Sequence, residues 1–150
     1  STSVGGPDLP PAEGRLLRDR ATAIKGVEGI DFDSCMACRI RSAKVVVSMG
    51  GYNTLCQIAR DRKPAVIVPR VYPRLEQDIR AQLWANRGVI DALDAETLTP
   101  KCLADRVLDV LQSGRQPAMG KLDLTGLDRV GERFESFWQT EEQHAAALCV

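Results

Sequence analysis

Several residue types are scarce in this sequence. Aromatic residues make up 5% of the 150 residues, and there is a single histidine. Lysine plus arginine and aspartate plus glutamate number 20 each, so neither sign of charge is in excess. A balanced charge gives no general attraction to nucleic acid or to anionic membranes. No apolar run approaches the ~18 residues that a membrane span needs, and no signal peptide is apparent. These absences leave one ordinary globular domain, for which 44% apolar residues suffice.

Cysteine is present but gives no obvious framework. The five cysteines are odd in number and scattered (Cys35, Cys38, Cys56, Cys102, Cys149). Cys35 and Cys38 have the Cys-x-x-Cys spacing that redox motifs and half zinc sites share. No second pair and no nearby histidine completes a four-ligand metal site. The segment also has a helical pattern with both cysteines on one face. We therefore expect the cysteines to act as small apolar packing residues in a reducing cytosol.

Strand and helix patterns alternate along the chain, and no hairpin signal interrupts them. We expect strands ending near residue 4 and over residues 27–32, 45–47, 65–69 and 89–90. We expect helices over residues 13–24, 35–41, 52–61, 75–86, 100–111 and from 124 onward. This alternation predicts an α/β fold, a Rossmann-like parallel sheet with helices on both faces. Residues 1–122 form the predicted α/β domain, and residues 123–150 form a C-terminal amphipathic helix and tail.

The stretch from Val45 to Gln57 is the clearest arrangement for chemistry. Its three valines predict a strand that is buried on both faces. Gly50 and Gly51 allow a tight turn and a close approach of main-chain N–H groups to a ligand. Asn53 and Thr54 follow at the start of a helix, where unpaired N–H groups carry partial positive charge. Strand, glycine turn and helix start together predict an anion site, most commonly for phosphate.

Two further loops follow predicted strands and belong with this turn. They hold residues 32–33 and residues 69–77. In parallel sheets, ligands bind beyond the C-terminal strand ends, near a switch point in the strand order. The three loops are therefore expected to converge on one crevice.

Three motifs in this order resemble the C-terminal domain of GT-B glycosyltransferases of family 28, most closely a bacterial branch of predicted glycosyltransferases. They are Val47-Ser48-Met49-Gly50-Gly51-Tyr52-Asn53-Thr54, Val68-Pro69-Arg70 and Pro73-Arg74-Leu75-Glu76-Gln77. The resemblance covers roughly residues 4–111. It implies a domain that binds a nucleoside diphosphate sugar, with a UDP-sugar as the expected donor. It also implies that the first strand-helix unit of that domain, with its glycine-rich loop, is missing here.

The resemblance implies a role for each matching residue. Phe32 and Asp33 are expected to contact the nucleobase, and Gln57 the ribose. Glu76 and Gln77 are expected to contact the donor sugar. The diphosphate is expected to lie against the glycine turn and helix start, which hold Gly50, Gly51, Tyr52, Asn53 and Thr54. The family usually has glutamate where this chain has Gln57, and an amide loses the charge-assisted strength of a carboxylate. Arg70 and Arg74 can add positive charge beside the phosphates. The alternatives are a solvated loop for both arginines, a helix-start charge for Glu76 and core packing for Phe32.

The family's acceptor site and general base belong to an N-terminal domain, which is the expected partner. The lone His144 is interpreted as an exposed tail residue, so these 150 residues alone are expected to be inactive. A helix N-terminus can stabilise the departing diphosphate without a metal, so no metal or cofactor is expected. The resemblance implies an inverting hexosyltransferase, located in the cytoplasm with scope for peripheral membrane association.

Two alternatives stay open. A nucleoside-diphosphate-sugar epimerase shares this architecture but needs catalytic carboxylates and a histidine that are not evident. A non-enzymatic module for nucleotide binding or partner docking fits the missing half and the change at Gln57. The aromatic face formed by Phe134, Phe137 and Trp138 can then pair with a second copy of the chain.

Overall fold

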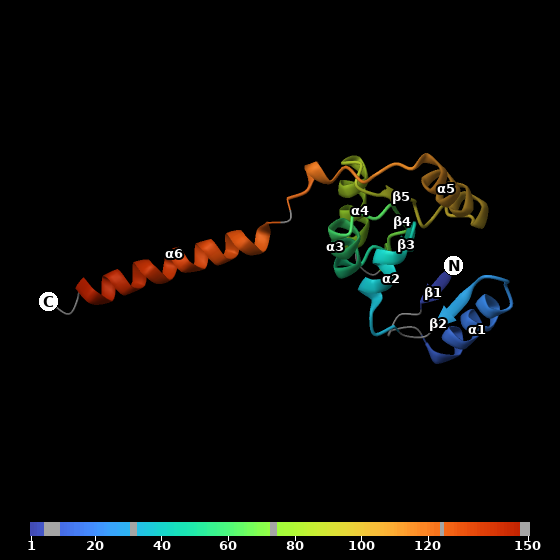
Figure 1. Cartoon of the computed structure of the whole chain (residues 1–150), viewed down its shortest axis with the longest axis horizontal. Helices are drawn as coiled ribbons and strands as arrows, with labels where there is room; N and C mark the ends of the chain where they lie inside the picture. The colour runs from blue at the N-terminus through green and yellow to red at the C-terminus, as the bar shows by residue number, and fades with distance from the viewer. Residues whose placement is uncertain (5–9, 31–32, 73–74, 124, 148–150) are drawn as a thin grey trace.

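In the computed structural model of this chain, parallel strands alternate with helices (Figure 1). The structure describes residues 1–4, 10–30, 33–72, 75–123 and 125–147, excluding the side chains of residues 121 and 139–147. The strands are β1 (Thr2–Val4), β2 (Glu28–Ile30), β3 (Val46–Ser48), β4 (Ala65–Ile67) and β5 (Asp91–Ala92). The helices are α1 (Pro11–Thr22), α2 (Met36–Ser42), α3 (Tyr52–Arg60), α4 (Glu76–Asn86), α5 (Pro100–Ser113), the 3-10 turn η1 (Met119–Lys121) and α6 (Gly126–Ala147). The predicted α/β fold is confirmed.

The strands form two parallel sheets rather than one. β1 pairs with β2, and β3, β4 and β5 form a second sheet in that order. Within the second sheet, Val66 of β4 lies opposite Val47 of β3 and Asp91 of β5. The central strand β4 is buried along its whole length, as a strand covered on both faces must be. β3 differs from its prediction, because Val47 is 47% exposed although its neighbours are valines.

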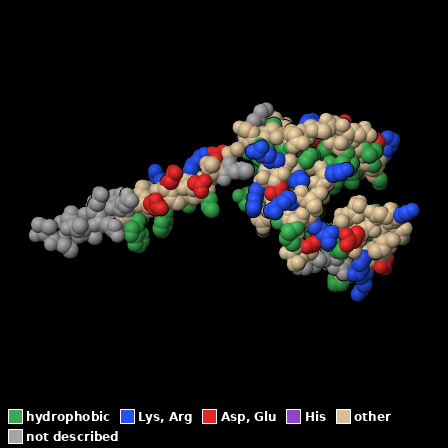
Figure 2. Space-filling model, viewed as in Figure 1, with side chains coloured by type: hydrophobic (Ala, Val, Ile, Leu, Met, Phe, Trp, Pro, Cys, Tyr) green, Lys and Arg blue, Asp and Glu red, His purple; other side chains and the backbone are tan. Residues whose placement is uncertain are grey.

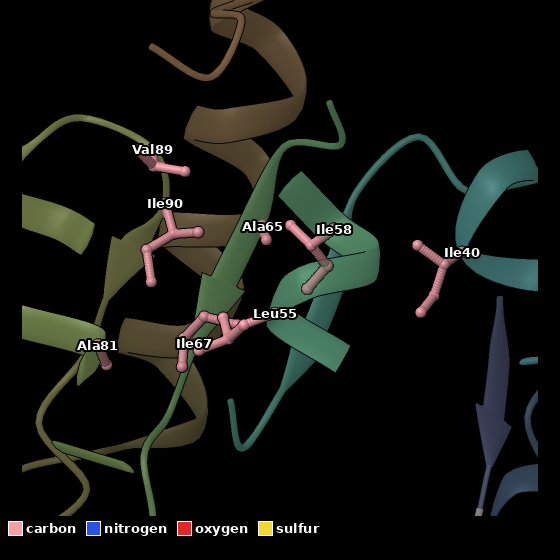
Figure 3. Packing of buried hydrophobic residues seen from close by; sticks show 8 residues of the cluster. All are labelled: Ile40, Leu55, Ile58, Ala65, Ile67, Ala81, Val89 and Ile90. Atoms are coloured by element: carbon pink, nitrogen blue, oxygen red, sulfur yellow. The ribbon is translucent and has the colours of Figure 1, made fainter. Parts of the chain in front are cut away.

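The hydrophobic core lies around β4 and covers both faces of the second sheet. On one face Leu55 and Ile58 of α3 and Ala81 of α4 pack against Ile67 (Figure 3). On the other face Val110 of α5 packs with Val66 and Leu93. Leu55, Ile58, Val66 and Ile67 are fully buried. This packed layer fixes the C-terminal ends of β3 and β4, from which the candidate site is built.

The last strand was predicted two residues too early. Val89 and Ile90 were expected to form it, but the pairing with β4 starts at Asp91. Both apolar residues are buried in the core just ahead of the strand, and the N–H of Val89 still donates to the Trp84 carbonyl at the end of α4. Burial therefore explains their apolar character, and strand pairing does not.

The cysteine prediction was wrong. Cys35 and Cys38 are joined by a disulfide bond at the start of α2, and both are exposed. Their Cα atoms are 5.3 Å apart, within the range that a disulfide spans. The first turn of α2 brings the two side chains together, so they bond to each other instead of packing inward. Cys56 and Cys102 are free.

The C-terminal helix α6 extends away from the sheets (Figure 1). Its large apolar side chains are exposed and gather along one side of the helix (Figure 2); they are Leu127, Val130, Phe134, Phe137 and Trp138. The rings of Phe134 and Trp138 stack with their centroids 6.4 Å apart. The division of the chain at residues 122 and 123 stays a prediction. Among the described residues, no helix combines the length and apolar character needed to cross a membrane.

Candidate functional site

The glycine turn after β3 contains two glycines with different surroundings. Gly50 has a φ of +75°, and its N–H donates a 3.1 Å hydrogen bond to the Ser48 hydroxyl. A Cβ on Gly50 would lie 2.7 Å from Cγ2 of the buried Ile67. Gly51 has a φ of −55°, and a Cβ there would meet no atom within 4 Å. Gly50 is therefore required by the turn, whereas Gly51 leaves open space beside the start of α3.

The N-terminus of α3 lies directly after this turn. Its first helical bond runs from the Leu55 N–H to the Gly51 carbonyl, at 3.0 Å. No side chain in the described part of the chain caps the helix start, and its first turn contains no acidic residue. Tyr52 and Asn53 are exposed, and Thr54 is partly buried. The first-turn N–H groups therefore present the positive end of the helix dipole at the end of the sheet, as an anion site requires.

An arginine on α4 lies beside this helix start. The guanidinium carbon of Arg80 is 5.2 Å from the centroid of the Tyr52 ring, and Arg80 forms an ion pair with Glu76. The pKa of Tyr52 is raised, chiefly because its hydroxyl hydrogen-bonds to the Cys56 side chain, while the charge of Arg80 acts in the opposite direction. The sequence interpretation missed Arg80, although its spacing of four residues from Glu76 is a recognisable ion-pair signal.

The loop after β4 contacts the start of α4. The N–H of Arg70 donates to Oε1 of Gln77 across 3.4 Å. Arg70 and Glu76 are exposed, and Gln77 is partly buried. The structure thus brings together the predicted diphosphate turn, the predicted sugar pair and one of the two predicted loop arginines. Arg74 lies outside the described residues.

Gln57 lies one turn further along α3 and has a partner on its own helix. Its Nε2 donates to Oδ2 of Asp61 at 2.7 Å. The Asp61 side chain is 10% exposed and also lies 3.8 Å from Nε of Arg41. An amide at position 57 can donate to this carboxylate, whereas a glutamate there would place two like charges side by side. Asp61 thus gives a local physical reason for the glutamine.

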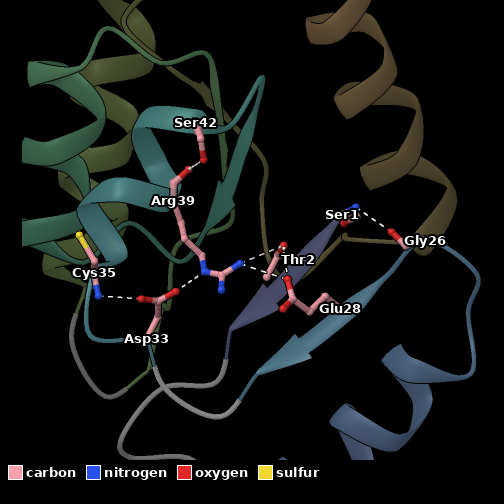
Figure 4. A network of polar contacts seen from close by, with 8 residues as sticks. All are labelled: Ser1, Thr2, Gly26, Glu28, Asp33, Cys35, Arg39 and Ser42. Carbon is pink, nitrogen blue, oxygen red and sulfur yellow. Dashed lines mark hydrogen bonds and ion pairs between the residues drawn. The ribbon is translucent and has the colours of Figure 1, made fainter.

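Asp33 belongs to a separate network that links β1 and β2 to α2 (Figure 4). Its Oδ1 accepts from the Cys35 N–H at 2.6 Å, and its Oδ2 pairs with Arg39 of α2. Arg39 also pairs with Glu28 of β2 at 3.1 Å. The Arg39 guanidinium, followed by the Cys35 N–H, lowers the pKa of Asp33, and the Asp33 hydrogen bond raises the pKa of Arg39. The carboxylate of Asp33 therefore holds its loop in place. Phe32 lies outside the described residues.

Among the described residues, no group of three or more histidine, cysteine, aspartate or glutamate side chains is arranged to hold a metal ion.

The model of the glycosyltransferase family 28 C-terminal domain matches residues 13–127, which is most of the chain. The chain belongs to this family. The glycine turn, the helix start of α3 and the first turn of α4 all lie inside the matched region.

Relatives within this family are longer proteins. A UDP-N-acetylglucosamine–N-acetylmuramyl-(pentapeptide) pyrophosphoryl-undecaprenol N-acetylglucosamine transferase from Methylorubrum extorquens (strain PA1) is 29% identical over 111 residues, covering 73% of this chain and 29% of the relative. An enzyme of the same name from Crocosphaera subtropica is 32% identical over 85 residues, covering 55% of this chain and 24% of the relative. This chain therefore spans less than a third of the curated relatives that it matches.

A solved structure has the same fold. The spinosyn forosaminyltransferase SpnP matches with a TM-score of 0.56 and 18% identity, over 75% of this chain and 25% of that one. The match supports the family 28 domain as an α/β unit of parallel strands and helices.

Proposed function

We propose that this chain is the donor-binding part of an inverting family 28 glycosyltransferase, and that it binds a nucleoside diphosphate sugar. The single observation that carries the proposal is the uncapped start of α3 after the Gly50-Gly51 turn, inside the matched family region. Relatives named for transfer from UDP-N-acetylglucosamine favour uridine as the base.

The diphosphate binds at the first turn of α3. The donor N–H groups there follow Gly51, where open space admits phosphate oxygens close to the main chain. Arg80 supplies a positive charge from α4, and Arg70 supplies a second from the neighbouring loop. As the bond between sugar and diphosphate breaks, negative charge grows on the leaving diphosphate. Fixed N–H dipoles and a fixed guanidinium stabilise that charge without rearrangement.

The resemblance to the family supports the assignment of the remaining parts of the donor. Glu76 and Gln77 accept hydroxyl groups of the sugar, Gln57 contacts the ribose, and the loop of Asp33 contacts the base. Gln57 shares its amide with Asp61, so its ribose contact is weaker than that of a free carboxylate. The acceptor and the general base come from an N-terminal domain, and the chain alone does not transfer sugar. A cytoplasmic location stays a prediction.

Calorimetry tests the proposal directly. UDP and UDP-N-acetylglucosamine are titrated into the chain alongside uridine, which lacks the diphosphate. We expect both diphosphates to bind and uridine to bind at least about tenfold more weakly, because the charged contacts are to phosphate. Absence of binding by either diphosphate at millimolar concentration would contradict the donor role.

The second candidate function is a non-enzymatic docking module, favoured by the exposed apolar side of α6. The two functions are separated by adding an N-terminal half taken from a family relative and assaying sugar transfer or donor hydrolysis. Turnover that depends on the added half supports the enzyme. Self-association of the chain that Phe137→Asp abolishes, with no turnover in any combination, supports the module and the predicted homodimer.

A further inference from the structure

The disulfide between Cys35 and Cys38 lies at the surface, at the start of α2. Both cysteines are exposed. Met36, which lies between them in the chain, is 38% exposed as well. Thiol–disulfide exchange begins when an outside thiolate attacks one of the two sulfur atoms, so it requires access of this kind. The bond is therefore placed where a second thiol can reach it.

The loop that this disulfide closes is short, because only two residues separate the cysteines. Closing a short loop removes less entropy from the unfolded chain than closing a long one, so the bond adds less to the stability of the fold. Exposed disulfides are also the labile ones, and the Cys-x-x-Cys spacing is the spacing of redox motifs. Loop length and exposure thus favour a bond that forms and breaks over a permanent structural link.

The first turn of α2 has few other supports. α2 contains seven residues, and helices this short are unstable on their own. Within the described residues, no side chain caps its N-terminus at Cys35. Ile40, the buried residue of α2, lies near the other end of the helix and packs in the core around β4. The core therefore holds the end of α2, whereas the disulfide and the contacts of Asp33 hold its start.

Both groups that hold the Asp33 carboxylate lie next to the bonded cysteines (Figure 4). The Cys35 N–H donates to Oδ1 at 2.6 Å, and Arg39, the neighbour of Cys38, pairs with Oδ2. The Cys35 carbonyl accepts from the N–H groups of Cys38 at 2.9 Å and Arg39 at 3.3 Å, which closes the turn. The disulfide spans this same turn. It thus restrains the two groups that hold Asp33 relative to one another.

We propose that Cys35 and Cys38 form a reversible redox site that exchanges with a dithiol, and that breaking their bond loosens the contacts of Asp33. A thiolate of the dithiol attacks one sulfur atom of the bond and forms a mixed disulfide. The other cysteine leaves as a thiolate and takes up a proton. The second thiol of the dithiol then attacks the mixed disulfide and frees the first cysteine. The dithiol becomes a disulfide by giving up two electrons and two protons, and the chain gains two thiols.

The loosened contacts also bear on the candidate donor site, since the loop of Asp33 is the proposed contact of the base. In the reduced chain this loop has more freedom, so binding a donor has to order it at a greater entropic cost. The oxidised chain is therefore the form that binds UDP more tightly. This consequence rests on the proposed function, whereas the redox site itself does not.

Reduction of the folded chain by dithiothreitol tests the redox site. Peptide mass spectrometry after alkylation is expected to find Cys35 and Cys38 linked to each other before reduction, alkylated after it, and linked again after treatment with oxidised glutathione. Hydrogen exchange is measured on the oxidised and reduced chains. The N–H groups of Cys35, Cys38 and Arg39 are expected to exchange at least about tenfold faster in the reduced chain. The Val46 N–H, in the second sheet, should stay within about twofold.

Two variants separate this bond from other effects of the reductant. The double variant Cys35→Ser with Cys38→Ser is expected to show the fast exchange of the reduced chain with and without dithiothreitol. Cys102→Ser removes a free, exposed cysteine on α5 and is expected to respond as the parent chain does. The comparison of the oxidised and reduced parent needs no substitution, so it decides the question even where the double variant does not fold.

Three results would overturn the redox site. They are a link from Cys35 to a cysteine other than Cys38, a bond that dithiothreitol reduces only after the chain unfolds, and equal exchange of the Cys35 N–H in the two forms. In calorimetry, reduction is expected to weaken UDP binding at least about threefold. Equal affinity in the two forms would overturn the coupling to the donor site. Absence of UDP binding in both forms would contradict the proposed function instead, and the mass and exchange measurements would still decide the redox site.

Discussion

Replacing Gly50 and Gly51 by alanine, one at a time, should show which glycine is needed for the fold of the turn and which for ligand binding. Gly50→Ala forces a non-glycine residue to a φ of +75°, which costs about 1–2 kcal/mol. It also places a methyl group 2.7 Å from Cγ2 of Ile67, which is fully buried. Overpacking of this kind costs about 1–3 kcal/mol. The sum is a loss of about 2–5 kcal/mol in the free energy of unfolding.

Gly51→Ala is the matched control one residue away. Its φ of −55° suits alanine, and its new methyl group meets no atom within 4 Å. The change in unfolding free energy should stay within about 1 kcal/mol, because the gain from a stiffer unfolded chain offsets a poorer helix cap. Thermal unfolding followed by circular dichroism should show Tm lowered by about 10 °C for Gly50→Ala and by no more than about 3 °C for Gly51→Ala.

Ligand affinity should follow the opposite order. The methyl group of Gly51→Ala occupies the open space beside the start of α3, so UDP should bind at least about tenfold more weakly to this stable variant. Equal Tm losses for the two variants would refute the assignment of Gly50 to the turn. An unchanged UDP affinity in Gly51→Ala would refute the close approach of phosphate to this position.

Three further predictions concern side chains. The pKa of Asp33 is lowered in the folded chain, so its carboxylate stabilises the fold fully above its unfolded pKa and loses that effect as pH falls through the folded pKa. In thermal unfolding at acid pH, the difference in Tm between the chain and Asp33→Asn should therefore shrink below pH 4. Gln57→Glu should lose the bond to Asp61 and about 1 kcal/mol of stability in denaturant titrations, while binding UDP more tightly but not 2′-deoxy-UDP; equal effects on both ligands would count against the ribose contact. Arg80→Gln should weaken UDP about tenfold in calorimetry and leave uridine unchanged, whereas Arg87→Gln, at the far end of α4, should change neither; a loss shared by UDP and uridine would argue against a phosphate contact.

The helices and the glycine turn could be predicted from sequence because their signals are local. The predicted range of α4 agrees with the structure to within one residue, since its apolar spacing and the following Gly88 mark its limits. The positive φ of Gly50 likewise follows from a glycine pair between a strand and a helix. The pairing of Gln57 with Asp61 is also local, four residues apart on one helix, and was available from the spacing alone.

Other features depend on contacts between distant parts of the chain. The exposure of Val47 depends on whether another strand covers the free edge of β3. A run of valines predicts a strand but does not say what lies beside it. Arg80 lies beside Tyr52 only because α3 and α4 pack on the same face of the second sheet. The apolar pair Val89 and Ile90 predicts a strand that is not there, because burial selects apolar residues in turns and strands alike.

The division into two sheets has a consequence for how the chain unfolds. Among the described residues ahead of α2, Ala21 is the only buried hydrophobic one, and both core clusters are built from residues of α2 onward. Within the described residues, the part formed by β1, α1 and β2 therefore shares almost no core with the rest. Arg39 of α2 contacts this part through Thr2 and Glu28. Two parts without a common core need not lose their structure at the same temperature. Heating should first release the N-terminal part, and the cooperative transition that follows should report on β3, β4 and β5 alone.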